Sequence, residues 1–432
     1  MRLLSRSIVL LALLMLVVAP FGVLAQTAPV TIDFYFPEAS ANNAQAIFEE
    51  YAAQFSELHP EITVNVAYQG SYTDNRTKIQ TELAAGAGPD VAVMLTTDLF
   101  SFVEDGTIVA AQPFIDAMED GEAFTEDFFP AFLLNSVDED GMIWSVPFQR
   151  STPILYYNAD LFAEAGIEAA PRSREELVEV AKQLTTDDRF GLWLPTEGFP
   201  IWLFSSFLIG GGQPLVEASP TDVFFNDEVS VEAVNYILSL SQEHKVMPEG
   251  LLSWGDAPTI FTSGQAAMIF HTTGSLTRIL SEATFEVGTA FMPTGSADAD
   301  GNGYGAPTGG GNLYLFANST PEEQAAAWLW IEFLASPEIQ ADWTARTGYI
   351  AARQSAWETD TLTTLVEAQP QYAIARDQLE FAQKEFSAFR TIDLQNIINP
   401  ALSNLIAGTE TDVQATLDAA QAQIDSLLAE YR

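Results

Sequence analysis

The chain has 432 residues, of which 59 are acidic and 17 are basic, so its formal net charge is −42. A surface of this charge repels nucleic acids and anionic lipids, because both require a basic binding surface. The chain has no cysteine, which excludes disulfide bonds, thiol catalysis, thiolate metal sites and a lipid-anchored cysteine. This length exceeds what one hydrophobic core accommodates, so two large lobes are expected.

Residues 1–25 have the pattern of a secretory signal peptide. Two arginines precede an unbroken apolar run at 8–19, and small residues at 23–25 suit signal peptidase. A membrane anchor is the alternative, but the run is short for a bilayer span. The sequence therefore predicts export by a cleavable signal peptide to the periplasm or another extracytoplasmic space.

Strands and helices alternate in the next part of the chain. Hydrophobic periodicity predicts strands at 30–36, 61–68 and 89–95, with helices at 39–58 and 73–85 between them. The third strand is apolar enough for a buried parallel sheet. This β-α-β-α-β order is typical of a sheet with helices on both faces.

The segment PFQRSTPILYYNADLFAEAG, residues 147–166, contains two strand-like runs on either side of a polar turn. Pro153 fixes the direction of the chain after the turn, because its ring restricts φ. On this pattern alone, the segment is an ordinary strand–turn–strand of an α/β protein.

Capping signals predict several later helices. Ser173 with Glu176 forms a capping-box pattern, and Thr320 with Glu323 forms a second one that includes a proline at the first helical position. Ser336 precedes a further proline that opens a helix. Strands are expected at residues 285–292 and 312–317, and helices are expected over most of residues 359–432.

Three loops suit ligand binding better than catalysis. Tyr72 follows the second strand, where open α/β sheets bind ligands, and its ring could stack on a sugar; a half-buried surface tyrosine is equally compatible. Thr272, Thr273 and Ser275 follow an apolar run and offer hydroxyl groups, although N-capping of the next helix by Ser275 or Thr273 is an alternative explanation. Gly310 lies in a triple-glycine segment that allows close approach of backbone amides, or that forms a flexible turn.

Aromatic side chains and acidic pairs give weaker signals. Trp202 is a candidate platform for the apolar face of a sugar, although most aromatic residues must lie in the core. Carboxylate pairs could serve a glycosidase, but 59 acidic residues produce such pairs by chance. The three histidines have no metal-ligand spacing, and the chain lacks the nucleophile-elbow, phosphate-loop and dinucleotide motifs. No metal, cofactor or catalytic site is therefore expected.

Six segments, in order, resemble the extracytoplasmic solute-binding proteins of carbohydrate ABC importers, and most closely their glycerol-3-phosphate-binding branch. They span nearly the whole mature chain and read GSYTDNRTKIQTELAAGAGPDVAVM, PFQRSTPILYYNADLFAEAG, FTSGQAAMIFHTTGSL, VGTAFMP, TGGGNLYLF and TGYIAA. The resemblance implies the α/β, periplasmic-binding-protein-like fold, in which two α/β lobes share a hinge and enclose a ligand cleft. It implies an N-terminal lobe of residues 26–147 plus 290–345 and a C-terminal lobe of residues 148–289 plus 346–432.

The resemblance also implies ligand contacts. Residues at the positions of family ligand contacts are Tyr72, Ser151, Thr272, Ser275, Gly310 and Tyr349. Thr96 stands where the family has an acid, with Asp98 close by. Gln395 stands where the glycerol-3-phosphate branch has its phosphate-binding arginine, although a small shift of the alignment would recruit Arg390 instead. Glutamine cannot supply the charge of arginine, so an uncharged ligand is expected.

The predicted function is capture of a sugar, oligosaccharide or polyol derivative by a monomer that delivers it to the permease subunits of an ABC importer. Lobe closure is expected to pivot about crossings near residues 147–151 and 285–293. Binding of glycerol 3-phosphate or a glycerophosphodiester in the same fold is the alternative ligand class. An exported carbohydrate-active enzyme, or a binding protein that serves a receptor kinase, would also be compatible with these features.

Overall fold

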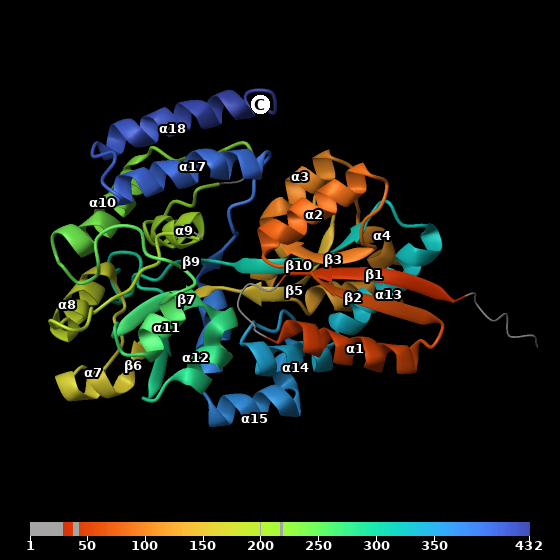
Figure 1. Ribbon diagram of the computed structural model, residues 1–432, viewed down its shortest axis with the longest axis horizontal. Coiled ribbons are helices and arrows are strands. Elements are labelled where there is room, and N and C mark those ends of the chain that lie inside the picture. Colours follow the sequence, from red (N-terminus) through yellow and green to blue (C-terminus); the bar gives the residue numbers. More distant parts are fainter. Residues whose placement is uncertain (1–28, 38–42, 199, 217–218) are drawn as a thin grey trace, which may run out of the picture.

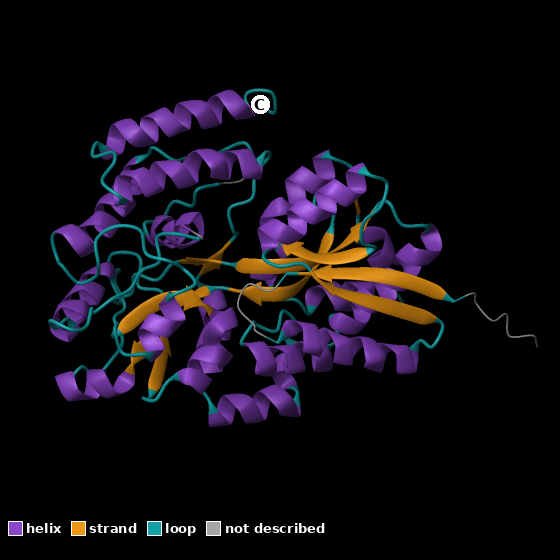
Figure 2. Ribbon diagram, viewed as in Figure 1, coloured by secondary structure: helices purple, strands orange, loops and turns teal. Residues whose placement is uncertain are grey.

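The computed structural model describes residues 29–37, 43–198, 200–216 and 219–432. The predicted signal peptide at residues 1–25 therefore lies outside the described residues. The described chain forms two lobes side by side, each with its own sheet and helices (Figures 1 and 2). Two α/β lobes, as predicted, are confirmed.

The first lobe is built on a six-stranded sheet of order β2-β1-β3-β10-β4, with β5 also paired to β10. β1, β2 and β3 are parallel, whereas β10 runs antiparallel to β3, β4 and β5. The strands are β1 Val30–Phe36, β2 Ile62–Tyr68, β3 Val91–Leu95, β4 Ile108–Val109, β5 Ser145–Ser151 and β10 Gly309–Phe316. The three predicted parallel strands are thus confirmed to within two residues at each end.

Helices cover both faces of this sheet because the buried strands are apolar on both sides. Along β3, Val91 and Val93 join the core under α1, α13 and α14, whereas Ala92 and Met94 join the core under α2 and α3. This arrangement follows from the alternation of side chains along a strand. The helices are α1 Ala44–Leu58, α2 Tyr72–Ala84, α3 Leu99–Glu104, α13 Pro321–Leu334 and α14 Pro337–Thr347.

The second lobe has a three-stranded antiparallel sheet of order β7-β6-β8. On β6, Leu155 joins one hydrophobic core and Tyr156 joins another, so this sheet is also covered on both faces. The strands are β6 Pro153–Asn158, β7 Met268–Thr272 and β8 Val287–Ala290. The helices packed around it are α7 Ala159–Ala165, α8 Arg174–Leu184, α9 Pro200–Gly210, α10 Glu228–Gln242, α11 Ala257–Thr262, α12 Leu276–Glu282, α17 Thr391–Ile406 and α18 Val413–Leu428.

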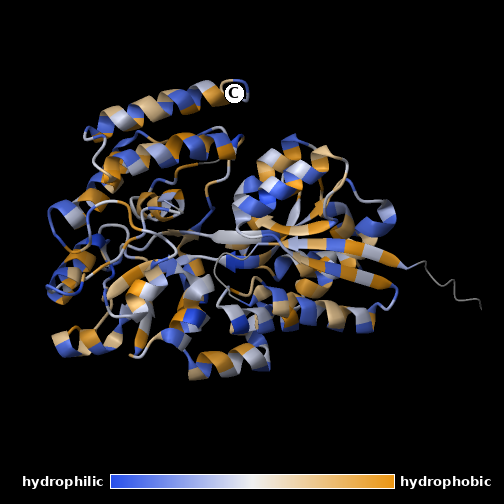
Figure 3. Ribbon diagram, viewed as in Figure 1, coloured by the Kyte–Doolittle hydropathy of each residue, from blue (hydrophilic) through white to orange (hydrophobic). Residues whose placement is uncertain are grey.

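The remaining elements are short. They are η1 Thr96–Asp98, α4 Gln112–Ala117, α5 Gly121–Glu126, α6 Pro130–Leu133, η2 Thr273–Ser275, β9 Ala306–Pro307, η3 Ser355–Glu358, α15 Asp360–Ala368, α16 Gln371–Asp377, η4 Gln378–Glu380 and β11 Ala382–Gln383. Hydrophobic and hydrophilic residues alternate along outer helices such as α18 (Figure 3). Among the described helices, none combines the length and the apolar character that a bilayer span requires.

The chain crosses between the lobes at three places. Thr152 connects β5 of the first sheet to β6 of the second, so the two predicted strands of residues 147–158 belong to different sheets. The chain returns between β8 and β10, and β9 pairs there with β11, which precedes the last crossing to α17. The predicted crossing at residues 285–293 is wrong, because β8 and Met292 still pack in the second lobe.

The predicted domain boundaries stay a prediction. Residues immediately after 345 bear on them, because Tyr349, Ile350 and Trp357 pack in the same hydrophobic core as α1 and α13. We propose that the last crossing, after β11, marks the return to the C-terminal lobe, since α17 and α18 join the core of that lobe.

The capping signals are largely confirmed. Thr320 and Glu323 form a reciprocal capping box at the start of α13. Ser173 caps α8, but the carboxylate of Glu176 accepts a hydrogen bond from the backbone of Arg172 instead of completing the box. Helix starts are thus well encoded locally, because the capping groups lie within one turn.

Candidate inter-lobe binding site

The candidate site lies at the end of the β5–β10 pair that borders the second lobe. Ser151 is buried and lies opposite Gly309 in this pair. Gly310 has a φ of 92°, and a β-carbon there would lie 2.1 Å from the carbonyl oxygen of Gln149, so only glycine suits this position. The predicted loop or turn at residues 309–311 is wrong in its local structure, because these residues hydrogen-bond to β5 as a strand.

Tyr72 begins α2, at the carboxyl end of β2, and its side chain is buried. Its hydroxyl accepts a 2.6 Å hydrogen bond from the Nε2 group of Gln149 on β5. Burial raises the pKa of the phenol well above its ordinary value, and the nearby Tyr349 acts in the same direction. The hydroxyl therefore stays neutral and retains a proton that it can donate.

Thr96 directly follows β3 and is buried. Its hydroxyl donates a 2.8 Å hydrogen bond to Oε2 of Glu385, which lies between β11 and α17. Burial raises the pKa of the Glu385 carboxyl to about 7, although the Arg150 guanidinium acts in the opposite direction. A carboxyl group from a distant part of the chain therefore lies beside Thr96, in addition to that of Asp98, which is close by in the sequence.

Arg150 of β5 is fully buried near this carboxylate. Its Nη1 group donates a 3.2 Å hydrogen bond to Oδ1 of Asn312, and its guanidinium lies 4.9 Å from the centre of the Phe132 ring. Its Nε and Nη2 atoms have no hydrogen-bond partner among the described residues. Burial lowers the pKa of Arg150 to about 10, so it still carries its charge at neutral pH.

A second buried ion pair lies next to Thr96. Asp98 accepts a 3.0 Å hydrogen bond from Nη1 of Arg76 on α2. Burial raises the pKa of the Asp98 carboxyl, whereas Arg76 lowers it. Because these two side chains form an ion pair, neither is a free charged group for ligand binding.

The second lobe contributes Trp202 on α9. Its indole nitrogen donates a 2.9 Å hydrogen bond to the backbone oxygen of Thr308, immediately before β10. Its ring meets Trp254 edge-on at 5.7 Å, and Trp254 stacks on His271 at 3.9 Å. Burial lowers the pKa of His271 to about 3, so this aromatic column is uncharged at neutral pH.

Thr272, Ser275 and Tyr349 meet at the start of α12. The Thr272 hydroxyl accepts a 3.1 Å hydrogen bond from the backbone of Gly274, so it caps the η2 turn. A β-carbon at Gly274 would lie 2.8 Å from Cζ of Tyr349, which means that the glycine admits this ring against the backbone. Ser275 is buried and occupies the N-cap position of α12, but its side chain makes no cap hydrogen bond. The predicted capping of the next helix by Ser275 or Thr273 is therefore wrong, because the cap hydrogen bond in this segment comes from Thr272 and closes η2.

Gln395 is the predicted site residue with the weakest connection to the others. It lies half-buried on α17, a helix that contacts η1. Arg390 at the start of α17 forms ion pairs with Asp393 and Glu430, at 2.7 Å and 3.4 Å. The hypothesis that Arg390 replaces the family arginine is disfavoured, because two carboxylates already hold its guanidinium.

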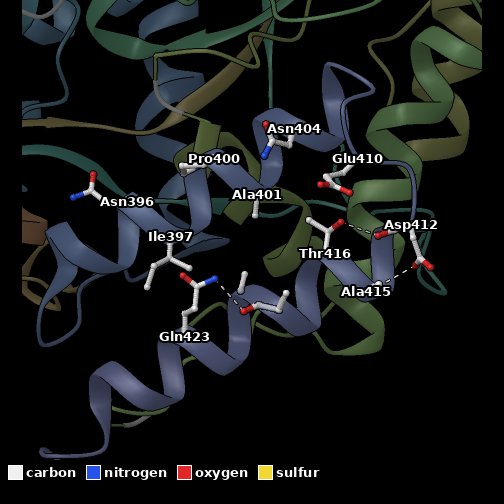
Figure 4. Close-up of a pocket in the computed structure, with 12 residues that line it drawn as sticks. Asn396, Ile397, Pro400, Ala401, Asn404, Glu410, Asp412, Ala415, Thr416 and Gln423 are labelled. Carbon is white, nitrogen blue, oxygen red and sulfur yellow. Dashed lines mark hydrogen bonds between the residues drawn. The ribbon is translucent and has the colours of Figure 1, made fainter.

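A surface pocket of about 420 Å³ lies between α17 and α18 (Figure 4). Asn396, Asn404 and Asp412 are among its polar lining residues, whereas Gln395 is not. The pocket belongs to the outer helix pair of the second lobe. It contains none of the predicted site residues.

The structure brings most of the predicted residues together around the lobe junction. Contacts along β5 and β10 connect the positions of Tyr72, Ser151, Trp202 and Gly310. Contacts at η2 connect the positions of Thr272, Ser275 and Tyr349. Thr96 is linked to these residues by its hydrogen bond to Glu385, whose carboxylate interacts electrostatically with Arg150 on β5. Their roles in ligand binding stay predictions.

Sequence reasoning missed Arg150 and Glu385, which interact electrostatically. Arg150 stands in the polar turn that the sequence singled out, so its charge was the available signal. Glu385 lies in a stretch without any motif, and only the fold brings it to Thr96. Within the described ranges, no group of three or more His, Asp or Glu side chains has a metal-binding arrangement.

The profile of a family described as bacterial extracellular solute-binding protein matches residues 50–372. Among curated proteins, the sn-glycerol-3-phosphate-binding periplasmic protein UgpB of Pectobacterium atrosepticum is 24% identical over 429 residues, which are 95% of this chain and 94% of that protein. UgpB of Salmonella typhimurium is 26% identical over 89% of both chains.

Solved structures have the same fold. UgpB from Mycobacterium tuberculosis in complex with glycerophosphocholine superimposes with a TM-score of 0.80 at 23% identity, over 93% of this chain and 99% of that chain. Maltose-bound T. maritima MalE3 superimposes with a TM-score of 0.79 at 23% identity, over 92% of this chain and 100% of that chain.

Proposed function

The chain belongs to the bacterial extracellular solute-binding proteins, and from this premise we propose that it captures an uncharged sugar, oligosaccharide or polyol derivative for an ABC importer. The proposal rests on one observation above all. Polar and aromatic residues of both lobes converge where β5 and β10 border the second lobe, and two of the nearby basic side chains, Arg76 and Arg390, already form ion pairs with carboxylates.

The proposed contacts follow from the chemistry of these side chains. Neutral hydroxyl and amide groups, such as those of Tyr72 and Gln149, bind sugar hydroxyls without a charge partner. The edge of Trp202 supplies an apolar surface beside them. The proposed set is completed by Thr96, Ser151, Thr272, Ser275, Gly310, Tyr349 and Gln395.

Binding proceeds by lobe closure about the three crossings. A ligand that contacts both lobes stabilises the closed arrangement, so it shifts a pre-existing equilibrium between open and closed forms. The closed protein then presents the ligand to the permease. We propose that the protein acts as a monomer outside the cytoplasmic membrane after removal of residues 1–25, and that it breaks no bond.

Isothermal titration calorimetry of the mature chain tests the ligand class. The panel contains maltose, trehalose, ribitol, glycerol 3-phosphate and glycerophosphocholine. Binding of at least one uncharged compound, recovered unchanged afterwards, is expected. Tight binding of a phosphate ester with no binding of an uncharged compound would overturn the proposed ligand class, and a cleaved sugar would favour an exported enzyme.

A glycerophosphodiester is the second candidate ligand. It is favoured by the curated relatives, which are named for glycerol 3-phosphate, and by the solved relative in complex with glycerophosphocholine. Against it stands Gln395, because a neutral amide cannot form the bidentate, charged contact that arginine makes with phosphate.

A further inference from the structure

Glu385 occupies a fixed position at the last crossing between the lobes. Its backbone nitrogen donates a 2.9 Å hydrogen bond to Oδ1 of Asn135, and its backbone oxygen accepts a 3.0 Å hydrogen bond from Nδ2 of the same side chain. Asn135 is fully buried. The segment is therefore held by a two-point contact, which fixes the position of the Glu385 backbone.

The carboxylate of Glu385 has unused capacity to accept hydrogen bonds. Its Oε2 atom accepts the hydrogen bond from Thr96, and this is its sole side-chain hydrogen bond among the described residues. A carboxylate has about four acceptor sites, and the side chain is only half-buried. Further donors must therefore come from water or from a bound ligand.

The two nearest charged groups act on Glu385 in opposite directions, and the attraction of Arg150 is the larger effect. Arg150 on β5 attracts it, and Asp98 on η1 repels it, although Asp98 is itself paired with Arg76. Tyr72 and Tyr314 lie near Arg150, and both keep their protons because burial raises their pKa values. The Arg150 guanidinium is fully buried, so Glu385 is the more exposed member of the pair.

We propose that Glu385 is a specificity-determining residue of the inter-lobe site, which accepts hydrogen bonds from the hydroxyl groups of an uncharged ligand and excludes phosphate esters by repulsion. This inference rests on the proposed function. A carboxylate suits hydroxyl donors, since charge-assisted hydrogen bonds are stronger than neutral ones. The same carboxylate disfavours a phosphate at this place, because two anions repel each other where water is scarce.

Calorimetry of wild type and Glu385→Gln tests this role. The amide has the shape of the carboxyl group without its charge. For the uncharged compound that the wild type binds, the variant is expected to bind about tenfold or more weakly. Glycerophosphocholine has a constant net charge near neutral pH. In the Glu385→Gln variant, the ratio of its affinity to that of the uncharged compound is expected to rise by about tenfold or more.

The pH dependence separates this role from a purely structural one. Burial raises the Glu385 pKa to about 7, so wild-type affinity for the uncharged compound is expected to increase from about pH 6 to about pH 8 as the carboxyl ionises. The Glu385→Gln variant is expected to lack this increase. Glu380→Gln is the matched control, because Glu380 is exposed and lies five residues earlier in the same segment.

The outcomes distinguish this inference from the proposed function. If the wild type binds an uncharged compound and Glu385→Gln binds it equally well at every pH, the role of Glu385 is wrong and the proposed function stands. If the wild type binds only phosphate esters, both are wrong. Circular dichroism and a thermal melt check that each variant is folded. The Thr96→Val substitution removes the hydroxyl that holds Glu385, so this variant is also expected to bind the uncharged compound more weakly.

Discussion

Gly310 combines a strained backbone conformation with close packing. Its φ is 92°, and the Gln149 oxygen occupies the place of a β-carbon. We expect Gly310→Ala to lower the free energy of unfolding by about 3 kcal/mol, because the alanine meets both the backbone strain and the steric overlap. Urea denaturation at neutral pH measures the change.

Gly264 provides the control for this substitution. It has a φ of 78°, and apart from its two chain neighbours no described residue has an atom within 4 Å of the place of its β-carbon. Gly264→Ala is expected to cost only about 1 kcal/mol, from backbone strain alone. Equal costs for the two variants would show that the contact with β5 does not restrict residue 310.

His271 makes stability depend on pH because it is buried as a neutral ring. Burial lowers its pKa from 6.5 to about 3, so the unfolded chain binds the extra proton between these values and stability falls as pH decreases through this window. Between about pH 7 and about pH 5, this single group should remove about 2 kcal/mol of stability. Urea denaturation of wild type and His271→Gln at both pH values measures it.

The comparison of wild type with His271→Gln separates the effect of His271 from that of groups whose contribution to stability changes with pH in the opposite direction. The pKa of Glu385 is raised from 4.5 to about 7, so its contribution to stability is lost as pH rises through that range. The His271→Gln variant should therefore lose less stability than wild type on acidification. His244→Gln, outside the buried aromatic column, should behave as wild type, and an unchanged pH dependence in His271→Gln would refute the assignment.

At the scale of elements, strands β5 and β6 show what a local pattern can and cannot reveal. The local pattern predicts the second strand at the correct residues, but it assigns Gln149, Arg150 and Ser151 to a polar turn, whereas these residues belong to β5. It does not reveal that the strands belong to different sheets, because a strand's partner depends on residues far along the chain. The partners of β5 and β6 are β10 and β7, which follow much later in the sequence.

Gln378 of η4 ties the crossings together. Its Nε2 group donates hydrogen bonds to Oγ1 of Thr152 at 2.9 Å and to the backbone oxygen of Pro153 at 2.6 Å. Its Oε1 atom accepts a 2.7 Å hydrogen bond from the backbone of Met292. We expect Gln378→Ala to cost about 3 kcal/mol of stability, since the substitution leaves buried polar groups without partners. Chemical denaturation of both proteins checks this value.

Gln383→Ala serves as the comparison for Gln378→Ala. Gln383 lies on β11, in the same region, but its side chain is exposed. Its replacement should change the free energy of unfolding by about 0.5 kcal/mol or less. A similar small change for Gln378→Ala would mean that the crossings do not depend on the buried amide.

At the scale of the whole molecule, the end of the chain connects the two lobes. The Tyr431 hydroxyl donates a hydrogen bond to the Glu104 carboxylate at the end of α3, and Phe389 packs against Phe100 at 5.2 Å. Figure 1 shows this end of the chain above α3. These contacts form a terminal clasp, defined by Phe100, Glu104, Phe389 and Tyr431.

Removing the clasp hydroxyl should favour the open arrangement. A net hydrogen bond contributes about 1 kcal/mol, so Tyr431→Phe is expected to shift the ratio of open to closed molecules about fivefold. Small-angle X-ray scattering of the ligand-free protein should give a larger radius of gyration for the variant. Tyr304→Phe, outside the clasp, is the control, and equal radii for Tyr431→Phe and wild type would contradict the effect.

The sequence supported the two-lobe architecture better than the connections between the lobes. The first β-α-β-α-β unit and the helix caps depend on short-range patterns, so they could be predicted. The last crossing at β11 could not be predicted, because this strand has two residues and pairs, in the described part of the chain, only with the equally short β9. Glu385 was missed for the same reason, since its environment depends on that crossing.

The contacts between the lobes also provide positions for fluorescent labels that report lobe movement. Ser219 of the second lobe donates a 3.3 Å hydrogen bond to Glu139 of the first, away from the clasp in sequence. Because the chain has no native thiol, Ser219→Cys and Glu139→Cys would provide the only two attachment points for fluorescent dyes. Contact quenching between such dyes would be relieved whenever the lobes move apart, so the natural binding protein could become an optical sensor for its own solute.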